Sequence, residues 1–180
     1  MKKLIVFLSL AIISLNVFSQ DLYKVSKADV KFTSDAKLEL IEAETTDAQG
    51  VVNNDENTFA FRIPMNTFRG FNSSMQRTHF NTNYLETAKY PYTIFEGKII
   101  EDVDFSKPGN YMVRGKGKFT CHGKVQERII KCKVKSQGGK ITITSGFSVF
   151  LEDHNIEIPT VVYQKIAEEI TVDLTFVLTK

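Results

Sequence analysis

Apolar and polar residues alternate along most of this 180-residue chain, as in strands that bury one face and expose the other. In one such run, Phe59, Phe61 and Ile63 alternate with Ala60 and Arg62. The pattern predicts about eight strands. The other alternating apolar faces are Ala28–Val30–Phe32, Val113–Gly115–Gly117–Phe119, Ile141–Ile143–Phe147–Val149 and Val172–Leu174–Phe176–Leu178.

Turn-forming residues separate these runs, as at Gln49-Gly50, Lys107-Pro108-Gly109-Asn110 and Gln137-Gly138-Gly139. Strands at this spacing form a sandwich or a barrel. Long first and last strands, with few residues that protect an edge, favour closure, because a closed sheet has no edge. The prediction is an all-β, antiparallel, eight-stranded barrel, which is about wide enough to hold one small ligand.

Residues 71–97 interrupt the β pattern and predict a short helix near residues 73–86, followed by a strand. Ser73 and Gln76 match a capping box, in which the hydroxyl accepts a backbone N–H and the glutamine reaches back. Pro91 predicts the end of the helix, because the residue before proline favours extended geometry. Such a helix would close one end of the barrel. The residues that recur at helical spacing are Met75, His79, Phe80 and Tyr84.

The first residues are typical of a secretory signal peptide. Lys2 and Lys3 precede an apolar run from Leu4 to Leu15, which is too short for a comfortable membrane span. We expect cleavage after Ser19, which leaves residues 20–180 as a single domain with one core. The expected location is therefore the periplasm or the exterior of the cell.

Charge excludes one class of partner. Loss of Lys2 and Lys3 lowers the number of basic side chains from 23 to 21, which equals the 21 acidic side chains. Binding of nucleic acid requires a basic excess to neutralise phosphates, so no nucleic-acid partner is expected. No segment after the signal is apolar enough to cross a bilayer.

The residue types that carry catalysis or bind metals are scattered. His79, His122 and His154 have no zinc-ligand spacing. Cys121 and His122 are neighbours on a predicted strand, so their side chains point to opposite faces and cannot act as nucleophile and base. We therefore expect no catalytic residues, no metal, no cofactor and no enzymatic activity.

Cys121 and Cys132 are the two cysteines of the chain. Residues 111–121 and 125–135 predict a hairpin in which Cys121 pairs near Gln126. Cys132 would then lie roughly 20 Å further along, whereas a disulfide needs α-carbons within about 7 Å. We expect two buried free thiols.

The inward-facing side chains can fill the barrel or line a lumen. Alternation alone favours a filled core, because small barrels can fill completely with side chains. Gly115 and Gly117 on an inward face favour free space. A lumen would suit an elongated apolar ligand, since each buried methylene contributes about 0.8 kcal/mol. The candidate lumen residues are Phe32, Phe59, Phe61, Met75, His79, Phe80, Phe95, Phe119, Ile130, Phe147 and Phe176.

Two residues of the predicted helix are candidates for binding a polar head group. His79 could donate a hydrogen bond at the barrel mouth, and the guanidinium of Arg77 could pair with a diphosphate or a carboxylate. The alternatives are a structural histidine bonded to backbone and a structural or surface ion pair of the arginine.

Several segments, in this order, resemble the signature of the YceI-like family over most of residues 25–180. Arg77-Thr78 stands where the family usually has Arg-Asp, and Phe119-Thr120 where it often has Leu-Thr. The segments that carry the resemblance are Arg77-Thr78-His79-Phe80, Tyr84-Leu85-Glu86-Thr87, Lys89-Tyr90-Pro91 with Phe95, Gly115-x-Gly117-x-Phe119-Thr120, His122-Gly123, Gly146-Phe147-Ser148-Val149, Asp153-His154 and Ile158-Pro159.

The resemblance implies an extended, lipocalin-like antiparallel barrel in a periplasmic or secreted protein that holds a long isoprenoid or another amphiphile. It reverses the preference for a filled core. The expected partner is a long-chain amphipathic lipid, isoprenoid-like or fatty-acyl, bound without catalysis. A stress-related interaction module with a filled core and functional loops is the alternative. The sequence leaves monomer and homodimer open.

Overall fold

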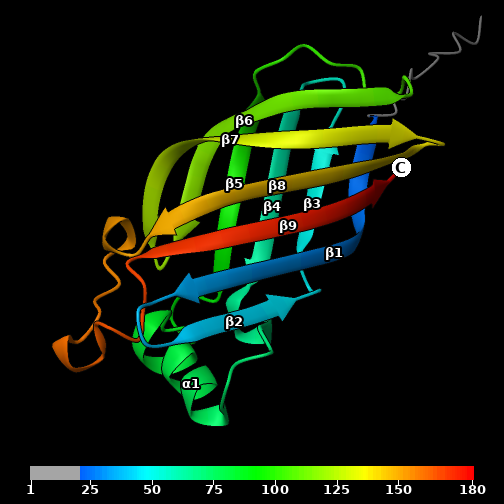
Figure 1. Cartoon of the computed structure of the whole chain (residues 1–180). Helices are drawn as coiled ribbons and strands as arrows, with labels where there is room; N and C mark the ends of the chain where they lie inside the picture. The colour runs from blue at the N-terminus through cyan, green and yellow to red at the C-terminus, as the bar shows by residue number, and fades with distance from the viewer. Residues whose placement is uncertain (1–20) are drawn as a thin grey trace, which may run out of the picture.

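The computed structural model describes residues 21–180 as a closed antiparallel β-barrel (Figure 1). The sheet order is β2-β1-β3-β4-β5-β6-β7-β8-β9, and β1 also pairs with β9, which closes the sheet. The expected signal segment, residues 1–19, lies outside the described residues. The strands are β1 (Leu22–Asp35), β2 (Leu40–Thr45), β3 (Gln49–Asn53), β4 (Thr58–Pro64), β5 (Tyr92–Ile99), β6 (Gly109–Cys121), β7 (Lys124–Gln137), β8 (Lys140–Phe150) and β9 (Glu169–Thr179).

The nine strand segments of residues 21–180 occupy eight positions in the barrel wall. β2 pairs with the second half of β1, from Val30 to Asp35, and β3 pairs with its first residues, from Leu22 to Lys24. β2 and β3 therefore act as one interrupted strand beside β1. The predicted eight-stranded antiparallel barrel is confirmed.

The predicted helix is confirmed at one end of the barrel (Figure 1). Helix α1 (Ser74–His79) continues as a π-helical turn at Phe80–Tyr84. Ser73 caps it, because its hydroxyl accepts the backbone N–H of Gln76 at 3.1 Å. The side chain of Gln76 reaches back one residue further than a capping box requires, to the backbone N–H of Asn72 at 3.1 Å.

Three short 3-10 turns complete the described elements: Met65–Thr67, Glu152–His154 and Thr160–Val162. The helical segment ends before the predicted stop at Pro91. Glu86 already has a φ of 44°, a left-handed conformation that commonly ends helices.

Two tight turns set the register of the long strands. His122 and Gly123 join β6 to β7 with φ values of 47° and 70°, and Gly138 and Gly139 join β7 to β8 with 61° and 72°. Positive φ at both central residues is the type I′ geometry, whose twist matches that of flanking strands.

The register keeps the two thiols apart. Cys121 pairs with Lys124 rather than near Gln126, because the turn holds two residues, and Cys132 pairs with Val113. Both cysteines are free in the structure, as expected, but only Cys121 is buried by surface exposure, whereas Cys132 is partly exposed. Burial raises the pKa of both thiols, so both stay protonated near neutral pH.

The barrel end opposite α1 is plugged by the loop between β5 and β6. Phe105, which is 1% exposed, packs there among the core side chains. Ser136 Oγ donates to the Phe105 carbonyl at 2.6 Å, and the Phe105 N–H donates to Asn54 Oδ1 at 2.7 Å. Because these bonds hold the loop in place over that end of the barrel, an opening to the interior can only lie at the α1 end.

Candidate functional site

The barrel is not filled, and its interior contains two adjoining cavities. The outer cavity lies at the α1 end and has a volume of about 380 Å³. The inner cavity, towards the plugged end, has about 90 Å³. Pockets for small ligands typically measure about 300–1,000 Å³, so the outer cavity is large enough to serve as one by itself. This free volume is inconsistent with a barrel interior that is completely filled by side chains.

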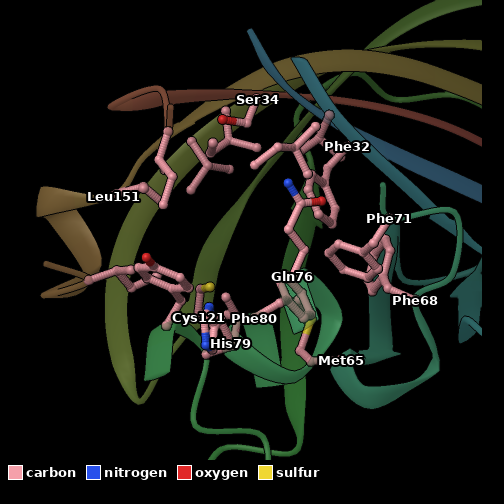
Figure 2. Close-up of a pocket in the computed structure, with 18 of the residues that line it drawn as sticks. Phe32, Ser34, Met65, Phe68, Phe71, Gln76, His79, Phe80, Cys121 and Leu151 are labelled. Carbon is pink, nitrogen blue, oxygen red and sulfur yellow. The ribbon is translucent and has the colours of Figure 1, made fainter. Parts of the chain in front are cut away.

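A cluster of aromatic rings from separate segments lines the outer cavity (Figure 2). Phe32 of β1 stacks on Phe80 of the π-helical turn, with ring centroids 5.4 Å apart and planes 11° apart. Phe68 lies 5.2 Å from Phe32, and Phe71 lies 5.1 Å from Phe80. The helical segment is thus attached to the barrel wall through apolar contacts that border the cavity.

Phe68 and Phe71 were missed in the sequence, although they contribute half of this cluster. They lie in the irregular segment between β4 and α1, where neither strand nor helix periodicity applies. The available signal was the spacing of three between Met65, Phe68 and Phe71, the large apolar residues of that segment.

Aromatic residues also dominate the inner cavity. Phe59 lies 4.8 Å from Phe95, and Phe61 stacks on Phe176 at 5.1 Å. A side chain at Gly115 would place its Cβ 3.0 Å from the ring of Phe59, so this glycine leaves room for the rings. Gly115 therefore preserves space on the inward face, as predicted.

Gly117 has a different role. A Cβ at this position would lie 2.0 Å from the carbonyl oxygen of Glu96, and a Cβ at the paired Gly97 would lie 2.1 Å from that of Lys116. The two glycines permit a close approach of the β5 and β6 backbones, which any side chain would prevent.

All of the predicted lumen residues except Met75 border at least one of the two cavities. Met75 is 66% exposed. Its neighbour Gln76 takes that place, while His79, Phe80 and Tyr84 of the predicted helical face do border the outer cavity. The predicted residues that line a cavity are Phe32, Phe59, Phe61, His79, Phe80, Phe95, Phe119, Ile130, Phe147 and Phe176.

The two predicted head-group residues differ in position. His79 borders the outer cavity and is also exposed to solvent. Arg77 does not border it; one guanidinium nitrogen, Nη2, donates instead to the carbonyl oxygen of Asn66 at 3.3 Å. Arg77 thus attaches the helix to the preceding loop.

Polar groups gather at the mouth of the outer cavity. Gln76 Nε2 donates to Glu39 Oε1 at 2.5 Å, and both residues border the cavity together with Lys165. The N–H of Leu38 donates to the carbonyl of Gln164 at 2.9 Å. The mouth is therefore formed by the β1–β2 turn, α1 and the segment before β9.

The outer side of the mouth also carries apolar side chains. Leu38 from the β1–β2 turn and Leu40 at the start of β2 are exposed, as are Val161 and Tyr163 from the segment before β9. Val161 is 89% exposed. The entrance thus combines a few charged groups with apolar surface inside and outside.

His154 lies next to Phe119, which lines the outer cavity, and is completely buried. Its ring meets that of Phe119 edge to face at 5.4 Å, and burial lowers its pKa, so the imidazole is neutral near neutral pH. Neither ring nitrogen has a hydrogen-bond partner. Within residues 21–180, no group of three or more His, Cys, Asp or Glu side chains could hold a metal ion.

No helix in this part of the chain is long and apolar enough to cross a membrane. The residues that border the two cavities make the interior an apolar lumen with a polar mouth at the α1 end. The arrangement can bury a long apolar group and contact a polar group at its end.

Comparison with known proteins agrees with this architecture. A family model described as a YceI-like domain matches residues 16–178. No curated protein sequence matches significantly. Among solved structures, a polyisoprenoid-binding domain from Saccharophagus degradans, implicated in plant cell wall breakdown, has a TM-score of 0.75 at 14% identity, covering 89% of this chain and 99% of its own.

Two further solved structures share the fold. BcnA of Burkholderia cenocepacia has a TM-score of 0.68 at 16% identity, covering 83% of this chain and 95% of its own. The YceI protein of Campylobacter jejuni has a TM-score of 0.54 at 11% identity, covering 100% of this chain and 99% of its own. At such identities the likeness concerns the fold.

Proposed function

The chain belongs to the family of YceI-like domains, and from that premise we propose that it binds or carries an amphipathic lipid in its barrel lumen without catalysing a reaction. The lipid has a long apolar chain, isoprenoid-like or fatty-acyl. The polyisoprenoid-binding domain of Saccharophagus degradans shares the fold and supports this class of ligand. Nucleic acid is not a partner in this proposal.

The observation that carries the proposal is the separation of apolar and polar surface along the lumen. Aromatic and aliphatic side chains line both cavities, while Glu39, Gln76, His79 and Lys165 stand at the mouth. Each methylene that leaves water contributes about 0.8 kcal/mol, so a long chain can be held with few polar contacts.

The same separation orients the ligand. The tail enters towards Phe119 and Phe95, and the head group remains near His79 and Lys165, where an N–H donor and an ammonium group are available. Arg77 is not part of this head-group site, because it contacts the backbone of Asn66.

We place this activity in the periplasm or outside the cell. The expected signal segment, residues 1–19, supports the location, as does an amphipathic ligand that needs a carrier in an aqueous compartment.

A matched pair of valine substitutions tests the lumen. Val149 borders the outer cavity and is buried, whereas Val125 on β7 is 55% exposed. Val149→Phe fills part of the cavity and is expected to weaken binding of geranylgeraniol at least several-fold. Val125→Phe adds the same ring outside the barrel and is expected to leave binding unchanged.

Binding is measured by displacement of a fluorescent isoprenoid, with circular dichroism to verify that each variant folds. Native mass spectrometry of protein purified from its own host then identifies the bound lipid. If no lipid co-purifies and no isoprenoid or fatty acid binds saturably, the proposed function is wrong. Equal binding by the two valine variants would place the ligand outside the lumen.

A further inference from the structure

A partition of four side chains separates the two cavities of the lumen. Ile63, Thr93, Phe119 and Phe147 border both the outer and the inner cavity. Phe119 of β6 and Phe147 of β8 meet edge to face, with centroids 6.1 Å apart and planes 81° apart. A chain that extends from the outer into the inner cavity must pass these two rings.

Arg128 of β7 contacts both rings of the partition. Its guanidinium carbon lies 5.7 Å from the ring centre of Phe119 and 5.9 Å from that of Phe147. Arg128 is two residues before Ile130, which lines the inner cavity, so both side chains lie on the inward face of the strand. Cations at this distance from aromatic faces are attracted to them, and more strongly where water is excluded.

The same arginine crosses a seam in the barrel wall. The β7–β8 ladder extends from the turn to the pair Lys133–Thr144, and neither residues 124–132 of β7 nor residues 145–150 of β8 continue it. The Nη2 group of Arg128 donates across this seam to the carbonyl of Ser148 at 2.6 Å. Ser145 Oγ donates to the carbonyl of Lys131 at 2.7 Å.

We propose that Arg128 is a specificity-determining residue that holds the partition closed and so sets which chain lengths reach the inner cavity. Its guanidinium fixes both aromatic rings at a place where the β7–β8 ladder has ended and the wall can widen. Short apolar chains then remain in the outer cavity. Longer chains displace the rings, because contacts with the inner cavity compensate for the displacement. This inference rests on the proposed lipid binding.

The two cysteines of the chain report on the two cavities separately. Cys121 borders the outer cavity and Cys132 the inner one. Reaction of each thiol with methyl methanethiolsulfonate, followed by mass spectrometry of the peptides, gives two rates in one sample. Geraniol, farnesol and geranylgeraniol serve as probes of increasing length.

In the wild type, geraniol is expected to slow only the modification of Cys121, and geranylgeraniol that of both thiols. Arg128→Met keeps an unbranched side chain of four heavy atoms and removes the guanidinium. In this variant, Cys132 of the ligand-free protein is expected to react several-fold faster relative to Cys121, and farnesol to protect Cys132 better than in the wild type.

Two further variants distinguish an opening of the partition from general destabilisation. General destabilisation would accelerate the reaction of both thiols alike and leave the ratio of their rates unchanged. Arg114→Met removes an exposed arginine whose Nε pairs with Glu101 at 2.7 Å outside the barrel, and is expected to keep the wild-type ratio. Arg128→Lys keeps the charge without the planar guanidinium, and an intermediate ratio is expected.

An unchanged ratio and protection pattern in Arg128→Met, with geranylgeraniol still protecting Cys121, would overturn the role of Arg128 and leave the proposed function intact. Failure of every alcohol to protect either thiol in the wild type would overturn lipid binding, and the chain-length rule with it.

Discussion

The imidazole of His122 lies 2.7 Å, through Nε2, from a carboxylate oxygen of Glu86. Its other nitrogen, Nδ1, lies 3.0 Å from the carbonyl oxygen of His154. Both partners are oxygen acceptors, so a ring N–H of His122 is the donor in each contact. His122 thereby joins the end of the helical segment, the β6–β7 turn and the 3-10 turn at residues 152–154.

Glu86→Gln is expected to lower the free energy of unfolding by about 1 kcal/mol, because a neutral amide oxygen replaces the charged acceptor next to the largely buried ring of His122. Urea denaturation measures this change. Glu127→Gln, at an exposed position of β7, is the matched control and should be close to neutral. Equal stability of the two variants would show that the contact contributes nothing.

His154 predicts a pH dependence of stability. Burial lowers its pKa below the ordinary value of 6.5, so the unfolded chain binds a proton that the folded protein excludes. The contribution is fully present above pH 6.5 and is lost as the pH falls from there towards the lowered pKa. The slope contributed by one such group approaches about 1.4 kcal/mol per pH unit.

The measurement is urea unfolding of the wild type and of His154→Phe at a series of pH values. The variant keeps an aromatic ring against Phe119 and the backbone carbonyl that His122 contacts, but it does not titrate. Its stability is expected to fall less steeply on acidification. Parallel pH profiles of the two proteins would rule out a contribution from His154.

Gly97→Ala is expected to destabilise the barrel by about 3 kcal/mol, because the added carbon meets backbone atoms of β6 that cannot move without disrupting the ladder. Gly146→Ala is the control. There the nearest atom is Asp173 Oδ1 at 2.8 Å, the end of a side chain that can rotate away. Thermal unfolding should separate the two variants clearly, and similar midpoints would contradict the close approach of β5 and β6.

Cys121 and Cys132 are expected to react slowly with iodoacetamide at neutral pH. Burial raises the pKa of each thiol above the ordinary value of 9.0, and the thiolate is the reactive form. Mass spectrometry should show that alkylation of both thiols is much slower in the native protein than in the unfolded chain. Rapid labelling of the native protein, or a mass increase on reduction, would contradict two buried free thiols.

At the helix, sequence and structure agree on the cap and differ at one residue of the inward face. The Ser73 cap was visible in the sequence, because it depends on residues within one helical turn. The inward face was misplaced at Met75, because contacts with distant groups select the face: Gln76 turns inward, where Glu39 accepts its amide. Phe68 and Phe71 were missed because their segment is irregular, so that their spacing of three from Met65 matches neither the strand nor the helix pattern.

The strands, the turns, the helix cap and the apolar character of the inward positions could be predicted from local sequence patterns. Each depends on the stereochemistry of neighbouring residues and on the strand period of about 2 or the helix period of about 3.6. Three features became visible only in the folded chain: the division of the interior in two, the end of the β7–β8 ladder at Lys133, and the contacts of Arg128 with Phe119 and Phe147. These features depend on which strands become neighbours and how their side chains share one interior volume, and alternation along a single strand carries no information about either.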